Sequence, residues 1–145
     1  METHRLPVAL RVTLVRPPAG VAFCIQGRDR ELLHRTQATG RDLSFDLTVL
    51  AARVGPSPRF FGDVTQGPPA ARFIYVCSGS MAGHAESCWT RRAKVALSPI
   101  TWRNIERLRE NPSARLEARF DGTAKDGGPA CASVKLLDGG WRFVP

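Results

Sequence analysis

The stretch Val8-Ala9-Leu10-Arg11-Val12-Thr13-Leu14-Val15 places apolar residues at every even position and polar Arg11 and Thr13 between them. Because successive side chains of a strand point to opposite faces, this alternation predicts a half-buried β-strand. The same period of two returns in residues 43–49, with Phe45, Leu47 and Val49 on one face. Both segments together indicate an antiparallel sheet with one face in water.

Further strands are expected on either side of a single helix. Ser98 and Pro99 are a suitable N-cap and first helical residue, and Asn111-Pro112 stops the helix, so a helix is predicted over about 99–110. Gly139-Gly140 predicts a tight hairpin turn between the last two strands. The other expected strands span 21–26, 31–36, 73–77, 93–97, 116–120, 131–137 and 141–144.

Many short strands with one inserted helix indicate a mainly β fold, either an antiparallel β-sandwich or a partly open β-barrel. The 145 residues fit a single domain over 1–145. Five phenylalanines fall on the apolar register of their strands and are expected in the core: Phe23, Phe45, Phe73, Phe120 and Phe143. The adjacent Phe60 and Phe61 lie on a Pro-rich segment, where they pin a loop to the core, cover a pocket or form a partner surface; pinning is favoured.

The net charge of +8 comes from 21 Lys and Arg against 13 Asp and Glu. Residues 1–57, 58–98 and 99–145 carry 8 and 5, 5 and 2, and 8 and 6 basic and acidic groups, so the excess is spread as +3, +3 and +2. A nucleic-acid partner is therefore an alternative and not the favoured one. No apolar run is long enough to span a membrane and no signal sequence begins the chain, so a cytoplasmic protein without membrane contact is expected.

Familiar catalytic and metal-binding motifs are missing from the sequence. The four cysteines contain no Cys-x-x-Cys pair, and the three histidines contain no spacing typical of a metal site, so neither a metal nor a cofactor is predicted. All four cysteines are expected to be reduced. His84 and Cys88 are four residues apart, but the glycines around them argue against the helix that would bring them together.

Several short segments occur in a consistent order: Gln66-Gly67-Pro68-Pro69 before Arg72-Phe73-Ile74-Tyr75, then Arg91-Arg92-Ala93-Lys94-Val95, Ile100-Thr101-Trp102, and Gly122-Thr123 through Cys131. Together they resemble a family of small uncharacterised bacterial proteins, catalogued as a domain of unknown function. The resemblance covers about Val8 to Leu136. It implies no activity, cofactor or catalytic residue.

The middle third of the chain concentrates cations and aromatics around turns rich in glycine and proline, which is typical of a binding site. If the strands at 72–77 and 93–97 are neighbours, Arg72 and Arg91 or Arg92 would converge on one carboxylate or phosphate. The alternative is that these arginines are solvated or paired with Asp63, Glu86 or Asp126. The candidate ligand-binding residues are Gln66, Arg72, Tyr75, Trp89, Arg91, Arg92 and Asp126, with Lys94 beside them.

These observations favour a non-enzymatic module that binds a small anionic ligand or an acidic segment of a partner protein. A cofactor-independent enzyme that uses the same cleft, with Asp126, His84 or Tyr75 as acid or base, is the alternative. A nucleic-acid-binding module is the third hypothesis. A homo-oligomer is also compatible with the sequence, because an edge strand at 141–144 could pair across a dimer unless Arg142 and Pro145 protect it.

Overall fold

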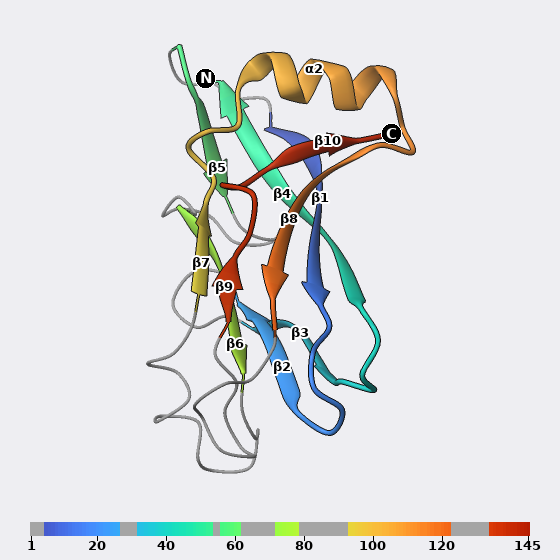
Figure 1. The fold of residues 1–145 in the computed structure, drawn as a ribbon. Coiled ribbons are helices and arrows are strands. Elements are labelled where there is room, and N and C mark those ends of the chain that lie inside the picture. Colours follow the sequence, from blue (N-terminus) through green and yellow to red (C-terminus); the bar gives the residue numbers. More distant parts are fainter. Residues whose placement is uncertain (1–4, 27–31, 54–55, 62–71, 79–92, 123–133) are drawn as a thin grey trace.

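The computed structural model describes residues 5–26, 32–53, 56–61, 72–78, 93–122 and 134–145, which form two β-sheets and one helix (Figure 1). Sheet A has the order β10-β8-β1-β4-β5, and β9 also pairs with β8. Its strands are β1 (Arg5–Val15), β4 (Leu43–Arg53), β5 (Pro58–Phe61), β8 (Arg115–Asp121), β9 (Lys135–Leu136) and β10 (Arg142–Val144).

Sheet B is antiparallel and has the order β3-β2-β6-β7. Its strands are β2 (Ala22–Gln26), β3 (Leu32–Gln37), β6 (Phe73–Ser78) and β7 (Ala93–Ala96). Sheet A curls so that β9 lies beside β7 (Figure 1), and the indole N–H of Trp141 donates to the carbonyl oxygen of Ala96 at 2.8 Å across this junction. The predicted fold class, a mainly β sandwich or partly open barrel, is confirmed.

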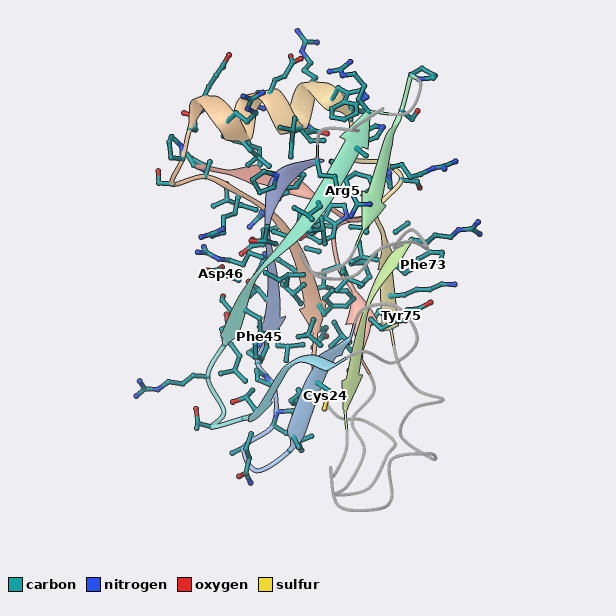
Figure 2. The ribbon with its side chains drawn as sticks, turned by 180° about the vertical axis from the view of Figure 1, so that it is seen from behind. Arg5, Cys24, Phe45, Asp46, Phe73 and Tyr75 are labelled. Atoms are coloured by element: carbon teal, nitrogen blue, oxygen red, sulfur yellow. The ribbon has the colours of Figure 1, made fainter. Side chains whose placement is uncertain are left out.

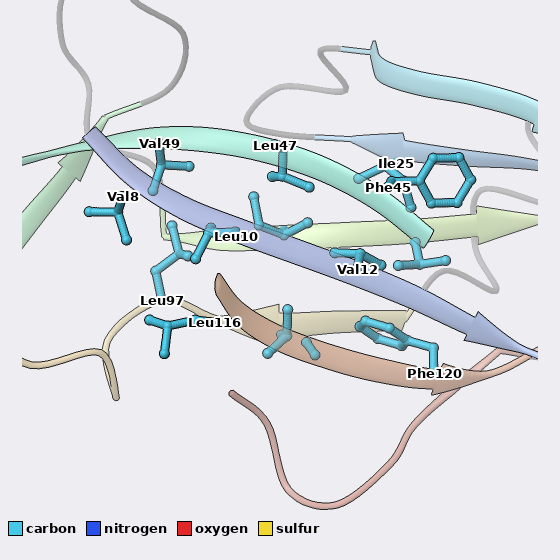
Figure 3. Packing of buried hydrophobic residues seen from close by; sticks show 14 of the residues in the cluster. Val8, Leu10, Val12, Ile25, Phe45, Leu47, Val49, Leu97, Leu116 and Phe120 are labelled. Carbon is cyan, nitrogen blue, oxygen red and sulfur yellow. The ribbon is translucent and has the colours of Figure 1, made fainter. Parts of the chain in front are cut away.

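The core lies between the inner face of sheet A and sheet B. Val8, Leu10, Val12 and Leu14 of β1 are fully buried, as the alternation predicts. Figure 3 shows Val8, Leu10 and Val12 packed with inward side chains of the neighbouring strands and with Leu97, which follows β7. Burying side chains of this size stabilises the fold by about 1.5–3 kcal/mol each, before the loss of chain entropy is counted.

Sheet A contains one parallel pair, β1 with β8. The chain crosses from β7 to β8 through α2 (Trp102–Glu110), which lies across one end of sheet A (Figure 1). The predicted helix start at Ser98 and Pro99 was wrong. Thr101 is the N-cap, because its hydroxyl accepts from the Asn104 backbone N–H and the Asn104 side chain accepts from the Thr101 N–H. The predicted stop at Asn111 is confirmed.

The predicted hairpin at Gly139-Gly140 was also wrong. β9 and β10 do not pair with each other; both run antiparallel to β8, one after the other along its edge. Asp138, Gly139 and Gly140 have positive φ and form a short excursion between them. Trp141 extends from the end of this excursion to Ala96.

The aromatic residues divide between the core and the surface. Phe23, Phe45 and Phe120 are buried as predicted, and Phe60, which lies on the unpredicted strand β5, is buried in the same core, so it pins its segment. Phe73 and Phe143 were placed in the core by their register but are only half-buried. A cation covers each ring: Lys94 over Phe73 and Arg107 over Phe143. No helix in the described part of the chain is long and apolar enough to cross a membrane.

Candidate functional site

The two strands that carry the described part of the predicted site are neighbours. β6 and β7 pair antiparallel, with Tyr75 opposite Lys94 and Phe73 opposite Ala96. The Leu97 N–H donates to the Arg72 carbonyl oxygen at 2.9 Å and extends the ladder by one residue. The predicted site requires that these two strands lie side by side, and they do.

Tyr75 and Lys94 lie on the outer face of sheet B, because Ile74 and Val76, which alternate with Tyr75, are buried in the core. The Lys94 ammonium lies 4.4 Å from the centre of the Phe73 ring, and the Phe73 and Tyr75 ring centres are 6.0 Å apart at a tilt of 46°. No carboxylate of the described residues forms a salt bridge with Lys94 or with Arg72. A lysine that lies over an aromatic ring, with no carboxylate partner in the described part of the chain, is a candidate contact for an anionic ligand.

The register separates Arg72 from the start of β7. Arg72 lies beside Leu97, whereas Ala93, where the chain from Arg91 and Arg92 enters β7, lies opposite Val76. Four residues of strand separate these positions, which is about 13 Å. Arg91 and Arg92 themselves lie outside the described residues, so their convergence with Arg72 stays a prediction.

Of the seven predicted site residues, the structure describes two. Arg72 is exposed just before β6, and Tyr75 is half-buried at its middle. The other five lie outside the described residues, as does His84 of the enzyme alternative and as does Cys88, which lies four residues from His84. Those five are Gln66, Trp89, Arg91, Arg92 and Asp126.

A second polar surface, which the sequence reading missed, occupies the outer face of sheet A. Four register neighbours form one row across four strands: Arg142 of β10, Glu117 of β8, Arg11 of β1 and Asp46 of β4. We call these four residues the charge row. Its signs alternate, and Figure 2 shows Asp46 on the opposite side of the molecule from Phe73 and Tyr75.

The charge row is held by short contacts. Arg11 Nε donates to Asp46 Oδ1 at 2.8 Å, and Arg142 donates to Glu117 Oε1 from Nε at 3.3 Å and from Nη2 at 3.1 Å. Glu117 is the most buried member, with a side chain only 11% exposed, and its Oε2 accepts from the Thr13 hydroxyl at 2.9 Å. Arg115 also approaches Asp46, at 3.4 Å.

The carboxylates of the row stabilise the charged form of Arg11. The hydrogen bond to Asp46, together with the negative charges of Asp46 and Glu117, raises the pKa of the Arg11 guanidinium above its ordinary value. In the sequence, the four residues of the charge row are isolated single charges. Their ion pairs could not be predicted, because they depend on which strands lie side by side. The described residues contain no group of three or more His, Cys, Asp or Glu that could hold a metal ion.

Comparison with known proteins gives a family but no characterised relative. Neither the curated proteins nor the solved structures contain a significant match to this chain. A family model does match it, over residues 8–144, and its description is "Family of unknown function (DUF5990)". The match spans nearly the whole described fold, from the first core residue of β1 to the end of β10, and so the chain belongs to the DUF5990 family.

Proposed function

We propose that the protein is a cytoplasmic bacterial binding module that takes a small anionic ligand, or an acidic segment of a partner, on the outer face of sheet B. The observation that carries the proposal is Lys94, placed 4.4 Å over Phe73 and beside Tyr75, with no carboxylate of the described residues paired to it. An anion at this position gains a charge-assisted hydrogen bond, and the aromatic rings supply apolar contact.

The candidate residues of the proposed site are Lys94 and Tyr75 at its centre, with Arg72 at the end of the β6–β7 ladder. Gln66, Trp89, Arg91, Arg92 and Asp126 complete the candidate set from the sequence. The outer face of sheet A gives less support to an anion site, because Asp46 and Glu117 already neutralise Arg11 and Arg142. For the same reason that face offers no support to a nucleic-acid interface.

Two probes test the proposal: phenyl phosphate, which combines an anion with a ring, and a hexaglutamate peptide, with hexaglutamine as its neutral control. Amide chemical shifts of the wild-type protein are followed in a titration with each probe. We expect saturable shifts in β6 and β7 with at least one anionic probe and none with hexaglutamine.

Lys94→Gln should weaken this binding by about fivefold or more, since the ion-assisted contact is lost while the strand is kept. Lys135→Gln, another exposed lysine on a strand, is the matched control and should bind as the wild type does. Charge reversal of Arg91 and Arg92 should abolish binding without unfolding the protein. Equal affinity of the wild type and Lys94→Gln, or shifts that map to sheet A, would reject the assignment.

A further inference from the structure

The charge row has a property beyond its internal pairing. Read from β10 to β4, its signs are plus, minus, plus, minus for Arg142, Glu117, Arg11 and Asp46. Reversing the order of the row reverses every sign. A row of this kind is complementary to its own copy when that copy is turned end for end.

A two-fold axis that runs parallel to the strands, midway between β8 and β1, produces this reversal. Two sheets related by such an axis pack face to face, and each residue of the row then lies over the residue at the mirrored position. Arg142 lies over Asp46 of the second copy, and Glu117 lies over Arg11. All four contacts across the axis join opposite charges.

The neighbouring rows are compatible with the same axis. Thr13 is the β1 partner of Arg119. The register between β1 and β8 begins at Leu10 and Leu116, and extending it by one residue sets Ala9 level with Arg115. The axis places Arg115 over Ala9 of the other copy and Arg119 over Thr13, so no arginine is set over another. A two-fold axis along the row would instead oppose like charges at all four positions, which costs free energy.

Side chains on this face are already ordered by bonds within the chain. Arg11 and Arg119 have side chains 33% exposed, and Arg115 has one 29% exposed, so these guanidinium groups lie along the sheet. Holding charged groups in place before contact reduces the entropy lost on association. Within the described residues, neither a helix nor a strand covers this face (Figure 1).

We propose that the outer face of sheet A is a homodimer interface, formed with a second copy of this chain through the charge row. The axis sets β8 over β1 and β10 over β4, so the shorter strand of each pair limits the overlap. The seven residues of β8 and the three of β10, at about 3.3 Å per residue and about 4.8 Å between strands, give roughly 300 Å² per copy. Stable dimers bury about 800 Å² per partner or more, so this dimer is weak and, because charges form it, sensitive to salt.

Sedimentation velocity across the micromolar range tests the proposal on the wild-type protein. We expect a monomer–dimer equilibrium whose dissociation constant rises at least about tenfold between low and high salt. A monomer at every concentration at low salt overturns the proposal, even if the same face retains an acidic peptide or a nucleic acid.

Exchange of the two ends of the row identifies the interface. Arg142→Glu and Asp46→Arg change the most exposed members, with side chains 54% and 48% exposed, so the fold should tolerate both. Each variant alone sets like charges against each other at two contacts and should dimerise at least about tenfold more weakly. An equimolar mixture restores opposite charges at both contacts and should form a heterodimer about as tight as the wild-type dimer.

Arg103→Glu makes the same charge change on α2 and is the matched control; its dimerisation should equal that of the wild type. Circular dichroism and urea unfolding check that each variant is folded. If one variant proves unstable, the salt dependence of the wild-type dimer remains as a separate test. Failure of two folded variants to recover association on mixing would overturn the proposed axis.

Discussion

Two tryptophans allow the same substitution, Trp to Phe, to be compared at an indole N–H that donates a hydrogen bond and at one that has no acceptor among the described residues. Trp141 Nε1 donates to the Ala96 carbonyl oxygen at 2.8 Å and joins the edges of the two sheets. Trp102 Nε1 is buried and has no acceptor among the described residues. Both indoles are partly buried against the core. Replacing each by Phe removes a donor from both sites but a hydrogen bond from only one.

Trp141→Phe is expected to destabilise the protein by about 1.2–2.2 kcal/mol. The lost hydrogen bond contributes about 0.5–1.5 kcal/mol net, since the Ala96 carbonyl loses its partner. The smaller ring gives up roughly 30 Å² of buried apolar surface, which adds about 0.7 kcal/mol. The variant should also loosen the junction of β7 with β9.

Trp102→Phe loses a similar area, and its contact with Arg53, whose guanidinium carbon lies 4.2 Å from the ring centre, weakens by about 0.5 kcal/mol or less. Against this, the substitution removes a buried donor whose desolvation costs about 1–3 kcal/mol. The sum lies between a destabilisation of about 0.2 kcal/mol and a stabilisation of about 2 kcal/mol.

Urea unfolding, followed by circular dichroism at a protein concentration low enough to keep the chain monomeric, measures both changes. The slope with denaturant should stay constant, so that midpoints report stability alone. The reasoning is refuted if Trp102→Phe costs as much as Trp141→Phe, because the two sites would then differ in nothing but packing.

Four further substitutions, one of which is a control, test the fold by the same unfolding assay. Thr101→Ala should cost about 1 kcal/mol through loss of the capping box, whereas Ser98→Ala should cost almost nothing; the reverse order would restore Ser98 as the N-cap. Phe60→Ala should cost about 3 kcal/mol or more, because its ring is buried in the core, and a loss below about 1 kcal/mol would contradict that placement. Glu117→Leu should cost about 2 kcal/mol, since the carboxylate accepts bonds from Thr13 and Arg142, and equal stability to the wild type would show those bonds to be without net value.

The strands that sequence periodicity predicted are those with one face on the core. β1 and β4 show why: their inward residues are buried at every second position, so the pattern and the packing express the same constraint. β5 was missed because Pro56 precedes it and Pro58 is its first residue, and prolines so close together indicate a loop. Its only described neighbour is β4, and an edge strand tolerates proline because one row of its N–H groups needs no partner.

The C-terminal segments show a limit of local turn chemistry. Gly139-Gly140 does permit a sharp change of direction, as the positive φ values show. Turn residues do not specify, however, which strand lies alongside. β8 pairs with both β9 and β10, and this choice is made by long-range contacts such as the bond from Trp141 to Ala96.

Local sequence also failed to show which residues of the candidate sites meet through strand pairing. Lys94 and Tyr75 were found in the sequence because they sit close to other cations and aromatics in one stretch of chain. The charge row was not found, because its four members come from positions 11, 46, 117 and 142 and meet only through strand register. A strand order with β1 parallel to β8 depends on the helical crossover, which no alternation pattern predicts.

The net charge of the chain does not distinguish two kinds of surface, which differ in the partners of their cations. On sheet A the row arginines are matched by carboxylates, so this face has little surplus charge for a polyanion but a sign pattern that fits its own copy. On sheet B, Lys94 lies over an aromatic ring and has no carboxylate partner among the described residues, which is why we propose this face, and not that of sheet A, as the anion site. Because these faces lie on opposite sides of the molecule (Figure 2), a dimer formed through sheet A would leave both sheet B sites open, and occupancy of one surface should not weaken the other.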